Sequence, residues 1–157
     1  PECWHPSAKR LPAMLAVVEG ATDFALHRTY LMPDGSGKAQ VEPPKAMLGQ
    51  VSGGAVRLAK ASGPLVVAEG VETALSLCCG ILNGPAAVWA ALSTAGLVSL
   101  NLPPKADKLV IAADNDKAGH SAAYALATKA SRIGWEVTLS PPESDADWNI
   151  VLQGMGK

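Results

Sequence analysis

The pattern of apolar and polar positions changes character near residue 62. Before that point, short apolar runs alternate with Gly, Pro and Asp, and two of them, Met14–Val18 and Phe24–Leu31, predict strands joined by a turn. The segment "MPDGSG" predicts another turn and "EPPK" a loop. The segment "PDGSGKAQ" is similar to a P-loop, but that motif needs Gly at position 32 and Ser or Thr at position 39. These positions are Met32 and Ala39, so we interpret the segment as a turn. We therefore expect residues 1–62 to form a small β-rich part.

From residue 63 onward the pattern alternates between strands and helices. Short apolar runs predict strands at Leu65–Ala68, Ala87–Ala91, Lys108–Ala113 and Glu136–Leu139. Periodic or Ala-rich runs between and after them predict helices at Val71–Leu82, Ser93–Leu100, Lys117–Arg132 and Asp147–Gln153. Short apolar strands separated by helices are typical of a parallel sheet covered on both faces. We expect residues 63–157 to form an α/β domain, a Rossmann-like parallel sheet of about four strands with helices on both faces.

Composition adds little to this picture, but the charge distribution adds something. Apolar residues make up 48% and charged residues 17%, as in ordinary soluble globular proteins, and a net charge of −1 gives no global basic character. Residues 1–60 carry seven Lys and Arg against five Asp and Glu, whereas residues 61–157 carry six against nine. This asymmetry suits a site where carboxylates hold a metal and face cations that hold phosphate. Ordinary scatter would also give a difference of this size.

The cysteines and the apolar runs indicate the cellular compartment and the relation to membranes. Cys3, Cys78 and Cys79 are odd in number and have no zinc-binding spacing, which favours a reducing, cytoplasmic setting. No apolar run approaches the roughly 18 residues that span a membrane, and no signal peptide is visible, so we expect no membrane partner. The sequence begins at Pro1, and we expect it to be part of a larger protein.

Acidic residues follow two of the predicted strands directly. Glu69 comes after Leu65–Ala68, and Asp114 and Asp116 come after the strand that begins at Lys108. Since the carboxyl ends of parallel strands meet at one edge, we expect these carboxylates to converge there. Unpaired, they would repel one another, and Mg²⁺ or Mn²⁺ would remove the conflict. Glu72, in the first turn of the next helix, is a fourth candidate ligand.

Each of these residues also has a simpler interpretation. Glu69 alone would be explained as an acid favoured by a helix dipole, and the two aspartates as a solvated turn. Gly70 allows a tight turn or a close approach of the backbone to a ligand. Ser93 and Thr94 open a helix beyond a strand, which predicts either a phosphate contact or simple capping.

Two motifs resemble a known family. "AEGVETALS" and "AADNDKAGHSAA" resemble the Glu-Gly and D-x-D motifs of the Toprim domain, which is shared by bacterial DnaG-type primases, topoisomerases of types IA and II, OLD-family nucleases and RecR-type recombination proteins. The resemblance is closest to the primases, including those of phages and mobile elements, in which x-A-G-x-x-A-A follows the D-x-D. "WAALSTAGL", "HRTYL" and "PPKAML" resemble further primase segments. The match covers roughly residues 14–135.

The resemblance implies a site and an activity. Glu69 would act in acid/base chemistry or metal binding, and Asp114 and Asp116 would be catalytic metal ligands. Arg28 and Lys45 would flank the same pocket and, with Arg57 as a further candidate, would contact nucleotide or template DNA. The implied activity is Mg²⁺-dependent nucleotidyl transfer that makes RNA primers during DNA replication. The implied partners are single-stranded DNA, nucleoside triphosphates and a replicative helicase.

This sequence departs from the primases in several places. Glu72 stands where an Asp is frequent, and the middle residue of the D-x-D is Asn115 rather than Gly. Neither change removes an oxygen ligand. The zinc-binding domain and much of the amino-terminal catalytic part of primases are not in this sequence, which bears on activity of the isolated chain. Two alternatives therefore stay open, an OLD-type nuclease that uses the same acids to activate water and a non-catalytic module associated with nucleic acid.

Overall fold

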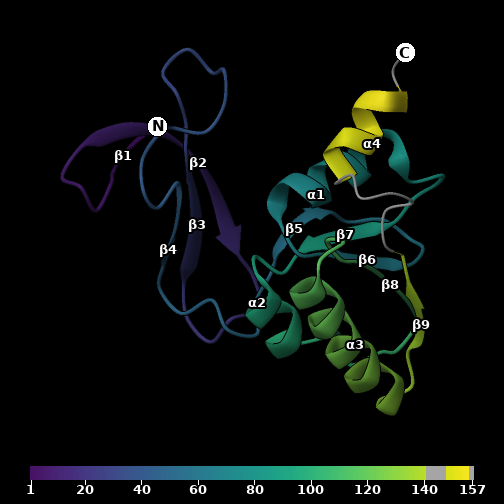
Figure 1. Ribbon diagram of the computed structural model, residues 1–157. Coiled ribbons are helices and arrows are strands. Elements are labelled where there is room, and N and C mark those ends of the chain that lie inside the picture. Colours follow the sequence, from purple (N-terminus) through teal and green to yellow (C-terminus); the bar gives the residue numbers. More distant parts are fainter. Residues whose placement is uncertain (141–147, 156–157) are drawn as a thin grey trace.

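A computed structural model describes residues 1–140 and 148–155, which contain two β-sheets (Figure 1). The first sheet is antiparallel, with the order β1-β2-β3-β4. Its strands are β1 (Glu2–Trp4), β2 (Arg10–Val18), β3 (Ala25–Tyr30) and β4 (Lys45–Leu48). The hairpin of β2 and β3 confirms the two strands predicted in this region. The sequence did not predict β1 or β4, and β4 begins directly after the Pro-rich loop.

The second sheet has five strands in the order β5-β7-β6-β8-β9. They are β5 (Val56–Ala59), β6 (Leu65–Ala68), β7 (Ala87–Ala90), β8 (Lys108–Ala112) and β9 (Glu136–Leu139). The last four are parallel to one another, which confirms the predicted parallel sheet. The unpredicted β5 adds an antiparallel edge strand beside β7. This strand belongs to the five-stranded sheet although it comes before the boundary expected at residue 62. The boundary itself stays a prediction.

The helices cover both faces of the five-stranded sheet, as predicted (Figure 1). They are α1 (Val71–Ser76), α2 (Thr94–Ser99), α3 (Lys117–Arg132) and α4 (Trp148–Met155). The helix expected over Val71–Leu82 is shorter, because a π-helical turn, Leu77–Ile81, follows α1 and contains Gly80 at φ 138°. The helix expected from Asp147 begins, within the described residues, at Trp148. None of the described helices is both long and apolar enough to cross a membrane.

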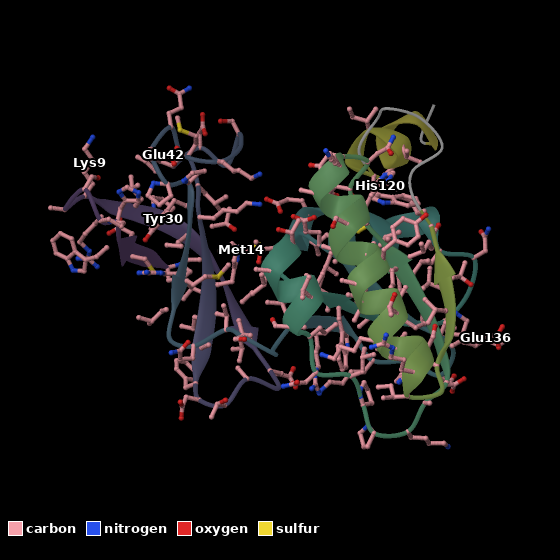
Figure 2. The ribbon with its side chains drawn as sticks, turned by 60° about the horizontal axis from the view of Figure 1, so that its bottom comes forward. Lys9, Met14, Tyr30, Glu42, His120 and Glu136 are labelled. Carbon is pink, nitrogen blue, oxygen red and sulfur yellow. The ribbon has the colours of Figure 1, made fainter. Side chains whose placement is uncertain are left out.

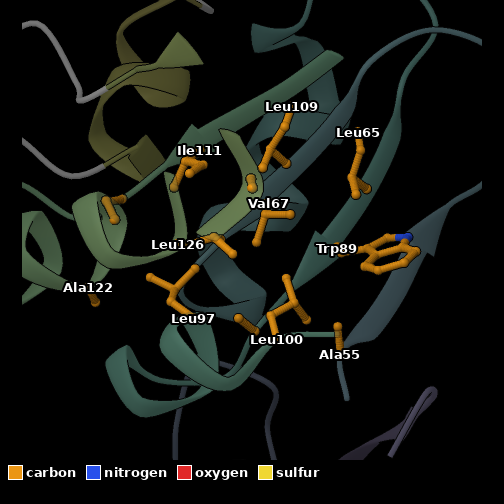
Figure 3. Packing of buried hydrophobic residues seen from close by; sticks show 14 of the residues in the cluster. Ala55, Leu65, Val67, Trp89, Leu97, Leu100, Leu109, Ile111, Ala122 and Leu126 are labelled. Atoms are coloured by element: carbon orange, nitrogen blue, oxygen red, sulfur yellow. The ribbon is translucent and has the colours of Figure 1, made fainter. Parts of the chain in front are cut away.

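The side chains of the buried strands point alternately to the two faces of the sheet and form an apolar layer on each face. Val67 and Ile111 face α2 and α3, where they pack with Leu97 and Leu126 (Figure 3). Val66 and its neighbours on the other face pack with α1, α4 and the end of β2. Successive side chains of a strand point to opposite faces, so strands that are apolar at every position serve both layers. The core thereby fixes β6 and β8, whose carboxyl ends carry the acidic motifs.

Candidate active site

The carboxyl ends of β6 and β8 bring the two acidic motifs to one edge of the sheet. These strands are direct parallel neighbours, and Ala68 lies opposite Ala112 in the register. Glu69 is the next residue after Ala68, and its backbone carbonyl accepts a hydrogen bond of 2.7 Å from the N–H of Leu92. Asp114 follows β8 after one further residue. The adjacency expected of the two strands is confirmed.

The Glu69 carboxyl is half-buried and faces other carboxylates. Burial raises its pKa, and the negative charges of Asp114 and Asp116 raise it further. The backbone N–H of Thr94, which donates to this carboxyl, and the ammonium of Lys45 act in the opposite direction. An acid whose pKa is raised by its like-charged neighbours shares an electrostatic site with them. The two motifs therefore interact across the edge of the sheet.

Local hydrogen bonds position the two aspartates. Asp116 is the N-cap of α3, and its carboxylate accepts a bond of 2.7 Å from the N–H of Gly119. Asp114 accepts a bond of 3.3 Å from the hydroxyl of Thr73 in α1. A Cβ at Gly119 would lie 2.6 Å from the backbone oxygen of Asp114, so only glycine lets the chain turn this closely. The acids are thus held by the first turns of two helices, and Asp116 is a helix cap rather than a solvated turn.

Glu72 pairs with two lysines of the antiparallel sheet and its loop. Its carboxylate oxygens lie 2.8 Å from the Nζ of Lys38 and 2.9 Å from the Nζ of Lys45. Although burial alone would raise the pKa of Glu72, these lysines lower it to about 2. The structure therefore gives Glu72 cationic partners, and its role as a metal ligand stays a prediction. Lys45 interacts electrostatically with Glu69 as well as Glu72, so it lies near the acidic edge, by which we mean the edge of the sheet that carries Glu69, Asp114 and Asp116. Lys38 reaches the same region through Glu72.

The expectation that Arg28 and Lys45 flank one pocket is wrong. Lys45 lies opposite Thr29 in the register of β3 and β4, whereas Arg28 lies opposite Ala46, so the two side chains project from opposite faces of this sheet. The Arg28 guanidinium donates to the backbone oxygens of Trp4 and Met47, both at 3.4 Å. A role for Arg28 in nucleotide or DNA binding stays a prediction, but at a separate surface.

Arg57 is engaged within the protein. Its guanidinium lies 4.4 Å from the centre of the Trp89 ring and 3.5 Å from a carboxylate oxygen of Glu19. Arg57 is on β5 and Trp89 on the neighbouring β7, at the edge of the five-stranded sheet that lies farthest from β9. These contacts account for Arg57 structurally, and its predicted contact with nucleotide remains untested.

The remaining predicted residues lie at helix starts beside the edge. Gly70 is the N-cap of α1 in an extended conformation, and a Cβ there would make only ordinary contacts. Ser93 caps α2 by accepting a bond of 3.0 Å from the N–H of Gly96. Thr94 directs its backbone N–H at Glu69. Capping therefore explains Ser93, whereas Thr94 serves the acidic edge directly.

Two residues at this edge were missed by the sequence interpretation. Lys38 lies in the segment interpreted as a turn, and Thr73 lies inside a predicted helix. Thr73 carried a usable signal, because it is a hydroxyl residue four positions after Glu69, in the first turn of the helix that follows Glu69. Lys38 carried none, since its partner Glu72 is brought to it only by tertiary packing.

Comparison with known proteins assigns the family. The model of the Toprim domain matches residues 64–157. The chain belongs to the Toprim domain family. Residues 1–58 match a second family, described as a domain of unknown function, DUF7146. The comparison with curated proteins gave no match. The Toprim family was the one expected from the Glu-Gly and D-x-D motifs, and the matched range contains both.

The fold of this Toprim protein is similar to that of a solved primase domain. The crystal structure of a DNA primase domain from Pseudomonas aeruginosa superposes with a TM-score of 0.50 at 16% sequence identity. The match covers 98% of this chain and 52% of that one, so this chain spans about half the length of that domain. At this identity the likeness establishes the shared fold.

The acidic edge of this Toprim domain has the donor chemistry of a Mg²⁺ site. Its side chains offer carboxylate oxygens. Burial raises the pKa of Glu69 most, the charges of Asp114 and Asp116 raise it further, and a divalent cation would remove this repulsive part. Among the described residues, no three His, Cys, Asp or Glu side chains are close enough to enclose a metal ion by themselves. Mg²⁺ usually keeps several waters and is completed by substrate phosphates, so it needs fewer protein ligands than an enclosed site.

Proposed function

We propose that this Toprim domain supports Mg²⁺- or Mn²⁺-dependent nucleotidyl transfer, in the manner of a primase that makes RNA primers on single-stranded DNA. The observation that supports the proposal is the parallel pairing of β6 with β8, which places Glu69 and Asp114 just beyond the ends of neighbouring strands. Nearby, Glu72 is paired with Lys38 and Lys45. Acids that hold a metal and cations that hold phosphate, side by side, are what phosphoryl-transfer chemistry requires.

Asp114 and Asp116 are the residues that would hold the metal, together with Glu69. A bound Mg²⁺ would neutralise phosphate charge and favour ionisation of the attacking hydroxyl. Glu69, whose pKa is raised, is suited to accept the proton of a primer 3′-hydroxyl. Thr73 and the N–H of Gly119 keep the two aspartates in place.

Lys38 and Lys45 are suited to hold the phosphates of the incoming nucleotide. Both ammonium groups already lie within 3 Å of a carboxylate oxygen of Glu72, so their position is fixed before a ligand arrives. A triphosphate carries more negative charge than this one carboxylate and would compete with it for the lysines. Lys45 thereby connects the antiparallel sheet to the chemistry of the Toprim sheet. The partners in this role would be single-stranded DNA, nucleoside triphosphates and a replicative helicase.

The test is to incubate the protein with single-stranded DNA, all four nucleoside triphosphates and Mg²⁺. Labelled primers that are lost in Asp114→Asn but kept in Glu136→Gln, which changes an exposed acid on β9, would support the proposal. Shortened DNA in place of primers would identify a nuclease. Binding of DNA without either product would identify a non-catalytic module. The longer protein should be tested alongside, because this chain spans half of the similar primase domain.

A further inference from the structure

A cavity of about 170 Å³ lies beside the acidic edge, on the α3 face of the sheet. Its apolar lining comes from Ile111 in β8, from Ala113 just beyond β8 and from Leu139 at the end of β9. His120 and Tyr124, one turn apart on α3, and Ser140 supply its polar groups. In an open parallel sheet this crevice beyond the strand ends is where ligands bind.

The cavity is continuous with the acidic motif. Ala113 lines it, and Asp114 is the next residue of the chain. His120, which stands near the amino-terminal end of α3 (Figure 2), lies with its Nε2 2.9 Å from the Oδ1 of Asn115, the middle residue of the D-x-D. A ligand whose charged end is held by the acidic edge and its metal would therefore have its other end next to this cavity.

The lining selects the kind of group that would enter. The cavity is smaller than the roughly 300–1,000 Å³ of sites for larger ligands, so it suits a single planar ring system. Ile111 and Ala113 are buried and offer an apolar wall, whereas the Tyr124 ring is 63% exposed and offers an aromatic face. The His120 ring and the Ser140 hydroxyl can hydrogen-bond to the edge of such a ring. An apolar face with a polar edge describes a nucleobase.

We propose that this cavity binds the base of the nucleoside triphosphate, with Tyr124 as the stacking residue and His120 and Ser140 at the base edge. The proposal rests on the proposed function, because it takes the phosphates to lie at the acidic edge. It adds Tyr124 and Ser140, which lie outside both acidic motifs, and gives His120 of the second motif a role. Tyr124 suits a test by mutation, since its exposed side chain contributes little to the core.

The experiment measures binding by calorimetry in Mg²⁺, using ATP and inorganic tripolyphosphate, which has the phosphates but no base. Tyr124→Ala is expected to weaken ATP binding about tenfold and to leave tripolyphosphate binding unchanged. Tyr124→Phe keeps the ring and is expected to restore the affinity. Phe24→Ala removes an equally exposed aromatic ring from the antiparallel part and serves as the matched control. Lys38→Ala should weaken both ligands alike.

The outcomes separate the two proposals. Equal ATP affinity in the wild type and Tyr124→Ala, with tripolyphosphate bound by both, would overturn the base site and leave the phosphate site standing. Equal weakening of both ligands by Tyr124→Ala would also overturn it, because a base contact affects ATP alone. A wild type that binds neither ligand would overturn the proposed function and the base site together. Thermal melting of each variant identifies any that fail to fold.

Discussion

The Nζ of Lys45 lies 2.9 Å from the Oε2 of Glu72 and joins β4 of the antiparallel sheet to the first turn of α1. Lys38 approaches the other oxygen of the same carboxylate, from the loop between β3 and β4. The pairing fixes two cations beside the acidic edge and ties the antiparallel sheet to the Toprim sheet. It therefore affects stability and ligand binding in ways that can be measured separately.

Glu72→Gln should lower the free energy of unfolding by roughly 1 kcal/mol at neutral pH, since each partly exposed ion pair contributes little. The folded-state pKa of Glu72 is about 2, below its ordinary 4.5. A lowered pKa stabilises the fold above the unfolded value, and the gain is lost as pH falls from 4.5 toward 2. Urea unfolding of both proteins across this range measures the difference.

The matched control for that series is Glu2→Gln. Glu2 makes a looser and more exposed pair with Arg10, at 3.8 Å, so its removal should leave the free energy of unfolding unchanged. A wild type and Glu72→Gln that unfold alike at pH 7 would contradict a stabilising role for the two lysine pairs.

Asp116→Asn should remove the response of the protein to divalent metal. Mg²⁺ at about 10 mM is expected to raise the melting temperature of the wild type, as a ligand of the folded state does. Asn caps helices as well as Asp, so the bond to Gly119 survives. Because one negative charge near Glu69 is lost, the metal-free melting temperature should rise slightly. If the mutant and the wild type gain equally from Mg²⁺, Asp116 is a helix cap and no more.

Glu69→Gln should make the metal-free protein more stable at neutral pH. The pKa of Glu69 is raised in the folded state, so its ionisation opposes folding. The wild type and the mutant should match below pH 4.5, and the wild type should lose stability relative to the mutant as pH rises through the folded pKa. Denaturation in EDTA across pH 4–8 provides the measurement. Parallel curves would show that neither burial nor the two aspartates raise the pKa of Glu69 in solution.

Arg57→Ala should lower the free energy of unfolding by about 1–2 kcal/mol, because the guanidinium loses its place over the Trp89 ring. Arg57→Lys keeps the charge and some of this contact, so its loss should be smaller. Both variants should bind ATP as the wild type does. A drop in ATP affinity without loss of stability would instead support the role at nucleotide that the sequence suggested.

The buried parallel strands were predictable because their apolar runs are continuous. β6 and β9 begin and end where the sequence predicted, and α3 does too, since Asp116 starts it and Gly134 follows it. The four residues of β5 mix Arg57 with apolar side chains, and their partner β7 lies much later in the chain. Short strands that are completed by distant partners leave no local pattern.

The position of the acidic residues was predictable from the sequence, whereas the position of the two lysines that pair with Glu72 was only partly predictable. Glu69 and Asp114 follow apolar runs directly, so parallel pairing alone brings them together. Lys38 meets Glu72 only after the loop between β3 and β4 folds over α1. Arg28 and Lys45 lie on opposite faces of the antiparallel sheet because of the register between β3 and β4. A resemblance between short segments does not reveal that register.

The position of β5 at the edge of the five-stranded sheet determines where the protein can be truncated. Its strand comes before the Toprim match at residue 64, yet it pairs along β7, between Val56↔Ala90 and Ala59↔Val88. A fragment starting at residue 64 would leave the N–H and C=O groups of β7 unpaired on that side. An exposed, apolar edge of this kind recruits strands from other molecules. Such a fragment should precipitate or self-associate, whereas one starting at residue 54 should stay dispersed.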